Sequence, residues 1–273
     1  MQNAFVPRQW TVSLTAAKVA DRSRSSLVPT PAIGPVVIDM SHIRKSLVIC
    51  STARSGSSWL DTLVASTGVM GNPDEYFQPL AMERISGIPA AATVTERLAR
   101  AVQIGTTNNG VFAVKILSWE MPKLMAQQDP VRTFPSPHFV HLTRRDILGQ
   151  AISNARALQT GAWQSFRKEE VEPQYNASMI DQSIQNLTMG NARWHAYFAR
   201  NGIEPLSLVY EDVVQDPDKA VTVIAQFMKM DVEVRIGSVP AQKLSIQRDA
   251  RNEEWRRRFL ADYAAADLPA STD

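Results

Sequence analysis

Four short runs of β-forming residues divide the chain, and each is followed by a segment with helical spacing. The first run, Leu47–Cys50, is wholly apolar, which is typical of a strand buried on both faces. The others are Val111–Leu117, His138–Thr143 and Leu206–Tyr210. Strands that alternate with helices in this way predict an α/β fold, with a mostly parallel sheet flanked by helices.

Apolar residues at helical spacing predict the helices. The first begins near Trp59 and ends at Gly68, because apolar residues recur at positions 59, 60, 63 and 64. Further helices are predicted over residues 94–104, 147–158, 180–201 and 219–230, and Asp146 is a natural N-cap or first-turn acid for the helix over 147–158. The polar segment 163–176 is predicted to be a loop or a lid.

Length and composition are those of an ordinary globular protein. The 273 residues suffice for one large α/β domain or two small ones, and the net charge of +2 does not indicate a nucleic-acid binder. The one cysteine, Cys50, lies in the first predicted strand and is expected to be a core residue. No apolar run approaches the roughly 20 residues of a membrane span, and none resembles a signal peptide, so we expect a cytoplasmic protein.

Residues 1–40 differ from the rest of the chain. They contain four prolines and a cluster of serines and arginines, which predicts an extension outside a main domain of residues 41–273. Residues 36–38 could add an edge strand. A docked arm is the main alternative, because Phe5 and Trp10 are costly to leave in water.

The turn after the first strand is the main candidate for an anion site. It reads STARSGSS from Ser51 to Ser58 and leads into a helix, whose first N–H groups can bind an anion. Gly56 lets the backbone come close, the serines donate from their hydroxyls, and Arg54 adds a permanent charge. The turn is not a Walker P-loop, which would need glycine at position 51 and lysine at 57. A plain polar turn is the alternative.

Other charged residues lie near the predicted strands. Lysine is rarely buried without a partner, so Lys115 lies either at the exposed end of the second strand or opposite an anion. Arg144 and Arg145 follow the third strand, where either an anion at the sheet's crevice or ordinary salt bridges would explain them. On spacing alone, Glu75 is a solvated turn carboxylate.

The C-terminal segment 247–258 carries five arginines. We expect residues 256–258 to lie on a solvated amphipathic helix. Arg248 and Arg251 are expected to precede that helix, within reach of the crevice.

Several segments, taken in order, resemble the bacterial trehalose-type carbohydrate sulfotransferases. They read STARSGSSWL, NPDEYFQ, VFAVKI, HLTRRDILGQAISNARALQTGAW and QRDARNEEW, and LVYEDVVQDP is similar to a strand-end segment of sulfotransferases at large. The resemblance covers about Lys45 to Tyr263 and implies the P-loop-like sulfotransferase fold. Ser58-Trp59 stands where the family commonly has threonine and an aliphatic residue, and the bulkier Trp59 could change the packing behind the loop or the acceptor pocket.

The resemblance implies a reaction and its site. The family transfers the sulfuryl group of 3′-phosphoadenosine 5′-phosphosulfate (PAPS) to a sugar hydroxyl. By resemblance, the 5′-phosphosulfate loop is Arg54, Ser55, Gly56, Ser57 and Ser58, the 3′-phosphate site is Arg144 and Ser153, and Glu75 matches the carboxylate proposed as general base. Arg54 would also act in catalysis by stabilising charge on the leaving oxygens. Lys115, Arg248 and Arg251 are further candidates for donor binding, and no metal is expected.

The acceptor implied by the resemblance is a sugar, a glycolipid or another small hydroxylated molecule, and family members dimerise. Two other functions remain open from the residues. One is an ATP-dependent small-molecule kinase, although the chain lacks the Walker lysine. The other is a nucleotide-binding protein without catalysis.

Overall fold

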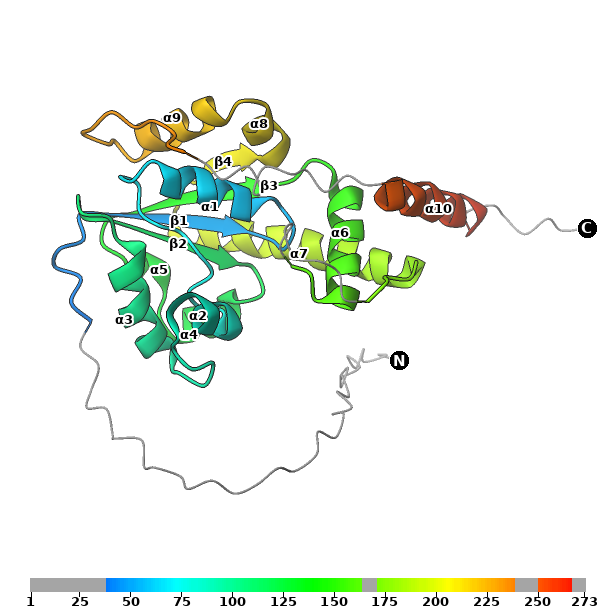
Figure 1. The fold of residues 1–273 in the computed structure, drawn as a ribbon, viewed down its shortest axis with the longest axis horizontal. Helices are drawn as coiled ribbons and strands as arrows, with labels where there is room; N and C mark the ends of the chain where they lie inside the picture. Colours follow the sequence, from blue (N-terminus) through cyan, green and yellow to red (C-terminus); the bar gives the residue numbers. More distant parts are fainter. Residues whose placement is uncertain (1–37, 164–170, 239–249, 267–273) are drawn as a thin grey trace, which may run out of the picture. The chain divides into compact units, whose positions relative to one another are not determined.

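Four parallel strands form a sheet in the order β2-β1-β3-β4 (Figure 1). The computed structural model describes residues 38–163, 171–238 and 250–266. The strands are β1 (Lys45–Ser51), β2 (Val111–Leu117), β3 (Pro137–Thr143) and β4 (Leu206–Val209). The four predicted strands and the parallel sheet are confirmed. The last strand is shorter than predicted, because Tyr210 begins a helix instead of ending β4.

The helices follow the predicted pattern where they are long. They are α1 (Ser57–Ser66), α2 (Pro79–Ser86), α3 (Val94–Gly105), α4 (Met121–Gln127), α5 (Pro130–Thr133), α6 (Ile147–Thr160), α7 (Ala177–Asn201), α8 (Tyr210–Gln215), α9 (Pro217–Phe227) and α10 (Ala250–Ala266). Helices α1, α3, α6, α7 and α9 confirm the predictions from spacing. Asp146 caps α6, since its Oδ1 accepts from the Gly149 N–H at 2.9 Å. Helices α2, α4, α5 and α8 were not predicted.

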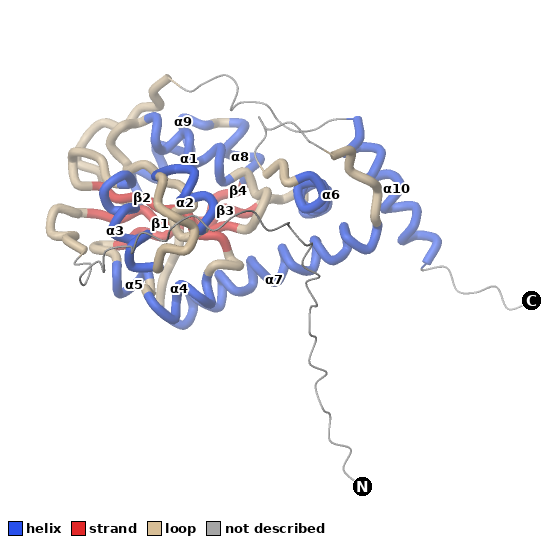
Figure 2. The backbone as a smooth tube through the Cα atoms, turned by 60° about the horizontal axis from the view of Figure 1, so that its bottom comes forward, coloured by secondary structure: helices blue, strands red, loops and turns tan. Residues whose placement is uncertain are grey.

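Helices cover both faces of the sheet, which explains the wholly apolar first strand. Leu47 and Ile49 of β1 pack with α1 and α9, whereas Val48 and Cys50 pack with α3, α4 and α7 (Figure 2). Side chains along a strand alternate between its two faces, so every position of this run is buried. Cys50 is the expected core residue, and burial raises the pKa of its thiol.

A third cluster of buried residues joins α6, α7 and α10. Ala151 and Ile152 of α6 pack with Leu187 of α7 and with Trp255 and Phe259 of α10. Trp255 and Phe259 are four residues apart and therefore lie on one face of α10. This face holds the C-terminal helix against α6, beside the carboxyl ends of the strands.

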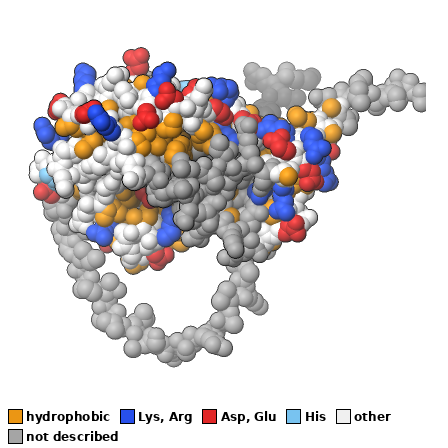
Figure 3. Space-filling view, turned by 45° about the horizontal axis from the view of Figure 1, so that its top comes forward, with side chains coloured by type: hydrophobic (Ala, Val, Ile, Leu, Met, Phe, Trp, Pro, Cys, Tyr) orange, Lys and Arg blue, Asp and Glu red, His pale blue; other side chains and the backbone are white. Residues whose placement is uncertain are grey.

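Some predictions fall outside the described residues. Nearly all of the extension 1–40 does, as do two of the three residues of the possible edge strand 36–38, so the domain boundary stays a prediction. In the predicted loop 163–176, only residue 163 and residues 171–176 are described, and these are not helical. Within the described ranges, no helix is long and apolar enough to cross a membrane. On the face shown in Figure 3, basic and acidic side chains are interspersed, in keeping with the small net charge.

Candidate active site

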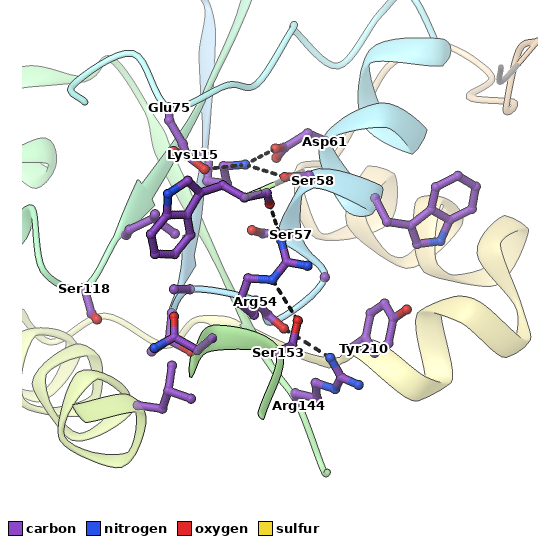
Figure 4. Close-up of a pocket in the computed structure, with 18 of the residues that line it drawn as sticks. Arg54, Ser57, Ser58, Asp61, Glu75, Lys115, Ser118, Arg144, Ser153 and Tyr210 are labelled. Atoms are coloured by element: carbon purple, nitrogen blue, oxygen red, sulfur yellow. Dashed lines mark hydrogen bonds and ion pairs between the residues drawn. The ribbon is translucent and has the colours of Figure 1, made fainter. Parts of the chain in front are cut away.

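The candidate residues meet at the carboxyl ends of the strands. β1 lies between β2 and β3, so the chain leaves β1 toward one side of the sheet and later returns to its other side. Ligands of parallel sheets bind in the crevice at such a reversal. A cavity of about 1440 Å³ lies here, and the residues that line it follow each strand in turn, among them Arg54, Ser118, Arg144 and Tyr210 (Figure 4).

The turn after β1 presents unpaired backbone N–H groups to this cavity. Arg54 and Gly56 have positive φ angles of 58° and 90°, and no side chain caps α1. Gly56, Ser57 and Ser58 all line the cavity, and their N–H groups donate no hydrogen bond within the described part of the chain. Unpaired N–H groups at a helix N-terminus form a site for an anion. The strand, turn and helix expected from the sequence are therefore present with the required geometry.

Gly56 is required by its backbone and by its neighbour. A Cβ atom added to it would lie 2.0 Å from Cδ2 of Tyr210, the residue that follows β4. The Arg144 guanidinium lies over the same tyrosine ring, with its Cζ 5.1 Å from the ring centroid. The anion loop, Tyr210 and Arg144 are thus packed as one unit.

Gly56→Ala is expected to destabilise the fold and weaken anion binding. An alanine here would have to adopt the left-handed backbone conformation, and its Cβ would also clash with the Tyr210 ring. Gly68→Ala is the matched control, since Gly68 also has a positive φ of 69° but no atom lies within 4 Å of its added Cβ. The control should lose only about 1–2 kcal/mol. Urea unfolding and titration with adenosine 3′,5′-bisphosphate measure both effects. Equal losses in the two variants would contradict the role of the Tyr210 contact.

Arg54 lies among other cations and reaches α6. Its Nε donates to Ser153 Oγ at 2.9 Å, and its Nη1 donates to the carbonyl of Trp163. Burial, together with Arg144 and Arg156, lowers the pKa of Arg54 to about 10. The guanidinium still carries its charge at neutral pH, and an anion beside it would relieve the repulsion among these cations.

The two arginines after β3 have different surroundings. Arg144 lines the cavity, and its Nη1 donates to the carbonyl of Arg54 at 3.2 Å. Arg145 is exposed and pairs with Asp212 at 2.9 Å. The salt-bridge interpretation therefore holds for Arg145, whereas Arg144 lines the cavity and makes only a long ion pair, with its Nε 3.9 Å from Glu211 Oε1. Glu211 accepts from the N–H groups of Arg145 and Asp146, which gives this acid a structural role.

Lys115 lies at the centre of a buried charge cluster. Its Nζ is 2.5 Å from Asp61 Oδ2, 3.1 Å from Glu75 Oε1 and 3.2 Å from Ser58 Oγ (Figure 4). The lysine is 1% exposed, so the prediction of an exposed strand end is wrong. Burial alone would lower the pKa of Lys115, but the carboxylates of Asp61 and Glu75 raise it, and the ammonium stays charged. Burial raises the pKa of Asp61 to about 7 although Lys115 opposes this.

Glu75 is not a freely solvated turn residue. Its side chain is 27% exposed, lines the cavity and pairs with Lys115. Through Lys115 it is linked to Ser58 of the anion loop. The carboxylate and the N–H groups of the loop therefore line one cavity, although the role of Glu75 as a base stays a prediction.

Several predicted site residues lie elsewhere. Ser55 is fully buried and does not line the cavity, so its side chain is not positioned as expected. Arg251 lies in the first turn of α10 instead of before it, 3.0 Å from Glu172 and away from the cavity lining. Arg248 falls outside the described residues.

Arg256 is a residue that sequence analysis misplaced. It was expected on a solvated face, but it lines the cavity and its Nη2 contacts both Asp146 oxygens at 2.7 and 2.6 Å. Arg257 and Arg258 are exposed, as predicted. Asp61 was missed altogether. The buried lysine of β2, which needs a partner, was the one signal for it. No group of three or more metal-ligating side chains occurs among the described residues.

Glu120 gives the fold a pH dependence near the site. Its Oε2 accepts from the Leu117 N–H at 2.8 Å, and burial raises the pKa of its carboxyl to about 8, with Glu75 adding to the shift. The pKa of Glu120 is higher in the folded chain than the value near 4.5 that it has in the unfolded chain, so the folded state favours the protonated carboxyl. The stability that this carboxyl contributes is complete below pH 4.5 and is lost as the pH rises through about 8. Stability should therefore fall across this range, by up to about 1.4 kcal/mol per pH unit.

Glu120→Gln is expected to flatten that dependence, because glutamine keeps an acceptor for Leu117 but does not titrate. Urea unfolding of the wild type and the variant at pH 5, 6.5 and 8 measures how the unfolding free energy of each depends on pH. Asp61 is present in both proteins, so its titration contributes equally to the two curves. The two curves would run parallel if Glu120 were ionised throughout.

A comparison with protein families decides where the chain belongs. The model of the Stf0 sulphotransferase family matches residues 46–262. The chain belongs to this family. The matched range agrees with the extent of the resemblance found in the sequence, and it includes every described residue of the site. As a member of the Stf0 family, the chain is a sulfotransferase.

Two curated relatives of this Stf0 chain are trehalose 2-sulfotransferases. The one from Mycobacterium tuberculosis strain Erdman is 28% identical, and the one from Mycolicibacterium smegmatis is 26% identical. Each alignment covers 84% of this chain and 100% of the relative. Among solved structures, the sulfotransferase domain from the curacin biosynthetic pathway is 13% identical with a TM-score of 0.46, over 85% of this chain and 94% of that one.

Proposed function

We propose that this chain is a PAPS-dependent sulfotransferase that transfers the sulfuryl group to a hydroxyl of a carbohydrate or glycolipid-type acceptor. One observation carries the proposal: the unpaired N–H groups at the start of α1 and the Glu75 carboxylate line the same cavity, joined by Lys115. An anion site beside a carboxylate is what transfer of an anionic group to a hydroxyl requires. The names of the curated relatives support a sugar as the acceptor.

The donor half of the site is assigned to the turn after β1 and to α6. In the proposal, the loop from Arg54 to Ser58 holds the 5′-phosphosulfate, chiefly through backbone N–H groups. Arg144 and Ser153 hold the 3′-phosphate. Their contacts support this assignment, because Arg54 bonds to Ser153 and Arg144 bonds to the Arg54 carbonyl, so all three side chains belong to one site.

The chemical step follows from the two halves. The acceptor oxygen attacks sulfur in line with the bond to the 5′-phosphate, and its proton passes to Glu75. The sulfur–oxygen bond breaks, and its electron pair stays on the phosphate of adenosine 3′,5′-bisphosphate. Arg54 and the N–H groups stabilise the charge that develops there. Lys115 pairs with Glu75 at 3.1 Å and holds its carboxylate at the cavity.

The decisive experiment is incubation with labelled PAPS and a panel of hydroxylated acceptors that includes trehalose, read by the mass of the product. We expect a sulfate ester and adenosine 3′,5′-bisphosphate without added Mg²⁺. A requirement for ATP and Mg²⁺ would instead point to the kinase, which family membership disfavours. Nucleotide binding without transfer to any acceptor would point to the non-catalytic alternative.

Arg144→Ala is expected to weaken binding of adenosine 3′,5′-bisphosphate by roughly 10–150-fold, the range for hydrogen bonds to a charged group. Arg145→Ala is the matched control, because this neighbour is exposed and pairs with Asp212. Isothermal calorimetry measures both affinities. Similar losses in the two variants would contradict the assignment of Arg144 to the 3′-phosphate.

The compartment is proposed from the apolar pattern of the sequence, and the assembly from the resemblance. We infer a cytoplasmic homodimer that binds neither nucleic acid nor a membrane through a spanning helix. Multi-angle light scattering of the full chain tests the dimer.

A further inference from the structure

Five large hydrophobic side chains surround the cavity and remain exposed to solvent. This apolar rim consists of Leu80, Trp119, Leu158, Trp163 and Met189, which are 46–66% exposed. Only nine large hydrophobic residues of the described ranges are exposed, so more than half of them line this cavity. Single exposed apolar residues are normal, but a group of them around a cavity indicates a ligand with an apolar surface.

Helices α2 and α7 each carry one residue of the apolar rim with an arginine four positions later. Leu80 and Arg84 of α2 are four residues apart, and so are Met189 and Arg193 of α7. Residues at this spacing share one helix face, and all four line the cavity. Each helix thus offers an apolar side chain next to a cation. Neither arginine has a partner among the described residues.

Backbone contacts place part of the rim near the proposed base. The Gln78 N–H donates to the Glu75 carbonyl at 3.1 Å, and α2 begins at the next residue, so Leu80 follows the turn that carries the carboxylate. A Cβ on Gly190 would lie 2.4 Å from Ser118 Oγ, so α7 packs closely against the turn after β2. Met189 and Trp119, the neighbours of these two residues, both line the cavity at this junction.

The apolar lining of the cavity exceeds what a donor and a free sugar need. Its volume of about 1440 Å³ is above the roughly 300–1000 Å³ of a site for one drug-sized ligand, so a donor and an acceptor fit in it together. The donor is assigned to polar groups of the anion loop and α6. A free sugar would pair with polar groups and leave the apolar rim in water, whereas an attached alkyl or aryl group would cover it.

We propose that the acceptor is amphipathic: a hydroxylated, sugar-like head at Glu75, joined to an alkyl or aryl group that packs on the apolar rim. The inference rests on the proposed function and deepens it. The rim residues select the acceptor, and they take no part in the chemical step.

Paired acceptors test this proposal. Sulfation of n-octyl β-D-glucoside and phenyl β-D-glucoside, below any micelle concentration, is compared with that of glucose and trehalose. The kcat/KM for the substituted glucosides should exceed that for glucose by at least about tenfold. Leu80→Gln combined with Trp119→Gln should bring this ratio close to one. Leu260→Gln is the control, because Leu260 of α10 is 54% exposed and lies outside the cavity lining. This variant should keep the wild-type ratio.

The outcomes separate the inference from the proposed function. A sulfated free sugar with no gain from the apolar group overturns the amphipathic acceptor and leaves the sulfotransferase assignment intact. A product from none of the four acceptors, with nucleotide binding intact, overturns the inference for glycosides and the sugar-directed function together. If the double variant turns a dimer into a monomer without changing the ratio, the rim is an interface between two copies and the inference is wrong.

Discussion

Glu75→Gln is expected to lower the turnover of sulfuryl transfer by roughly 10²–10⁴-fold, the range for loss of a general base. The amide keeps the size of the side chain but cannot accept the hydroxyl proton at neutral pH. Binding of adenosine 3′,5′-bisphosphate should change little, because the proposed donor contacts come from the loop after β1, Arg144 and Ser153 and do not include Glu75. Steady-state rates and calorimetry on the same preparation measure the two quantities.

The control for this variant is Glu83→Gln. Glu83 is an exposed glutamate of α2 that does not line the cavity, so its substitution should keep the rate. Wild-type turnover in Glu75→Gln would exclude Glu75 as the base. A loss of nucleotide affinity equal to the loss of rate would show instead that the carboxylate serves the donor site.

Lys115→Met is expected to cost about 3–5 kcal/mol of unfolding free energy, because it leaves the Asp61 carboxylate buried without its partner. Methionine fills a similar volume, so the loss reports the missing charge and not a cavity. Urea unfolding at neutral pH measures it. The variant should also lose activity, since Lys115 contacts both Ser58 and Glu75.

A double variant shows whether the ion pair is the cause. Lys115→Met together with Asp61→Leu removes both buried charges, and replacing a buried pair by apolar residues is often nearly neutral for stability. The double variant should therefore be more stable than the single one. A double variant as unstable as Lys115→Met would show that packing around β2, and not the unpaired carboxylate, determines the loss.

The sheet and the longer helices could be predicted because their signals are local. A run such as Leu47–Cys50 is apolar at every position only if both faces of its strand are covered, and α7 repeats its apolar positions over many turns. Helices α4, α5 and α8 span seven, four and six residues, too few for a period to emerge. Tyr210 was assigned to a strand because its aromatic side chain favours one, but the chain turns into α8 there.

The partners inside the site could not be predicted, because they come from distant parts of the chain. Asp61 and Lys115 are 54 residues apart, and Asp146 and Arg256 are 110 apart. Spacing within one element says nothing about such pairs. The resemblance identified Arg54, Arg144 and Ser153, and the structure brings these three together. It gave no warning that the Ser55 side chain turns into the protein interior.

The unpaired amides at the start of α1 bear on which substitutions this loop tolerates. Every residue type except proline supplies the same main-chain donor, so the anion contacts of these amides do not depend on which side chain stands at each position. The positions that the geometry of the loop restricts most are the glycine that makes the turn and the aromatic ring packed against it.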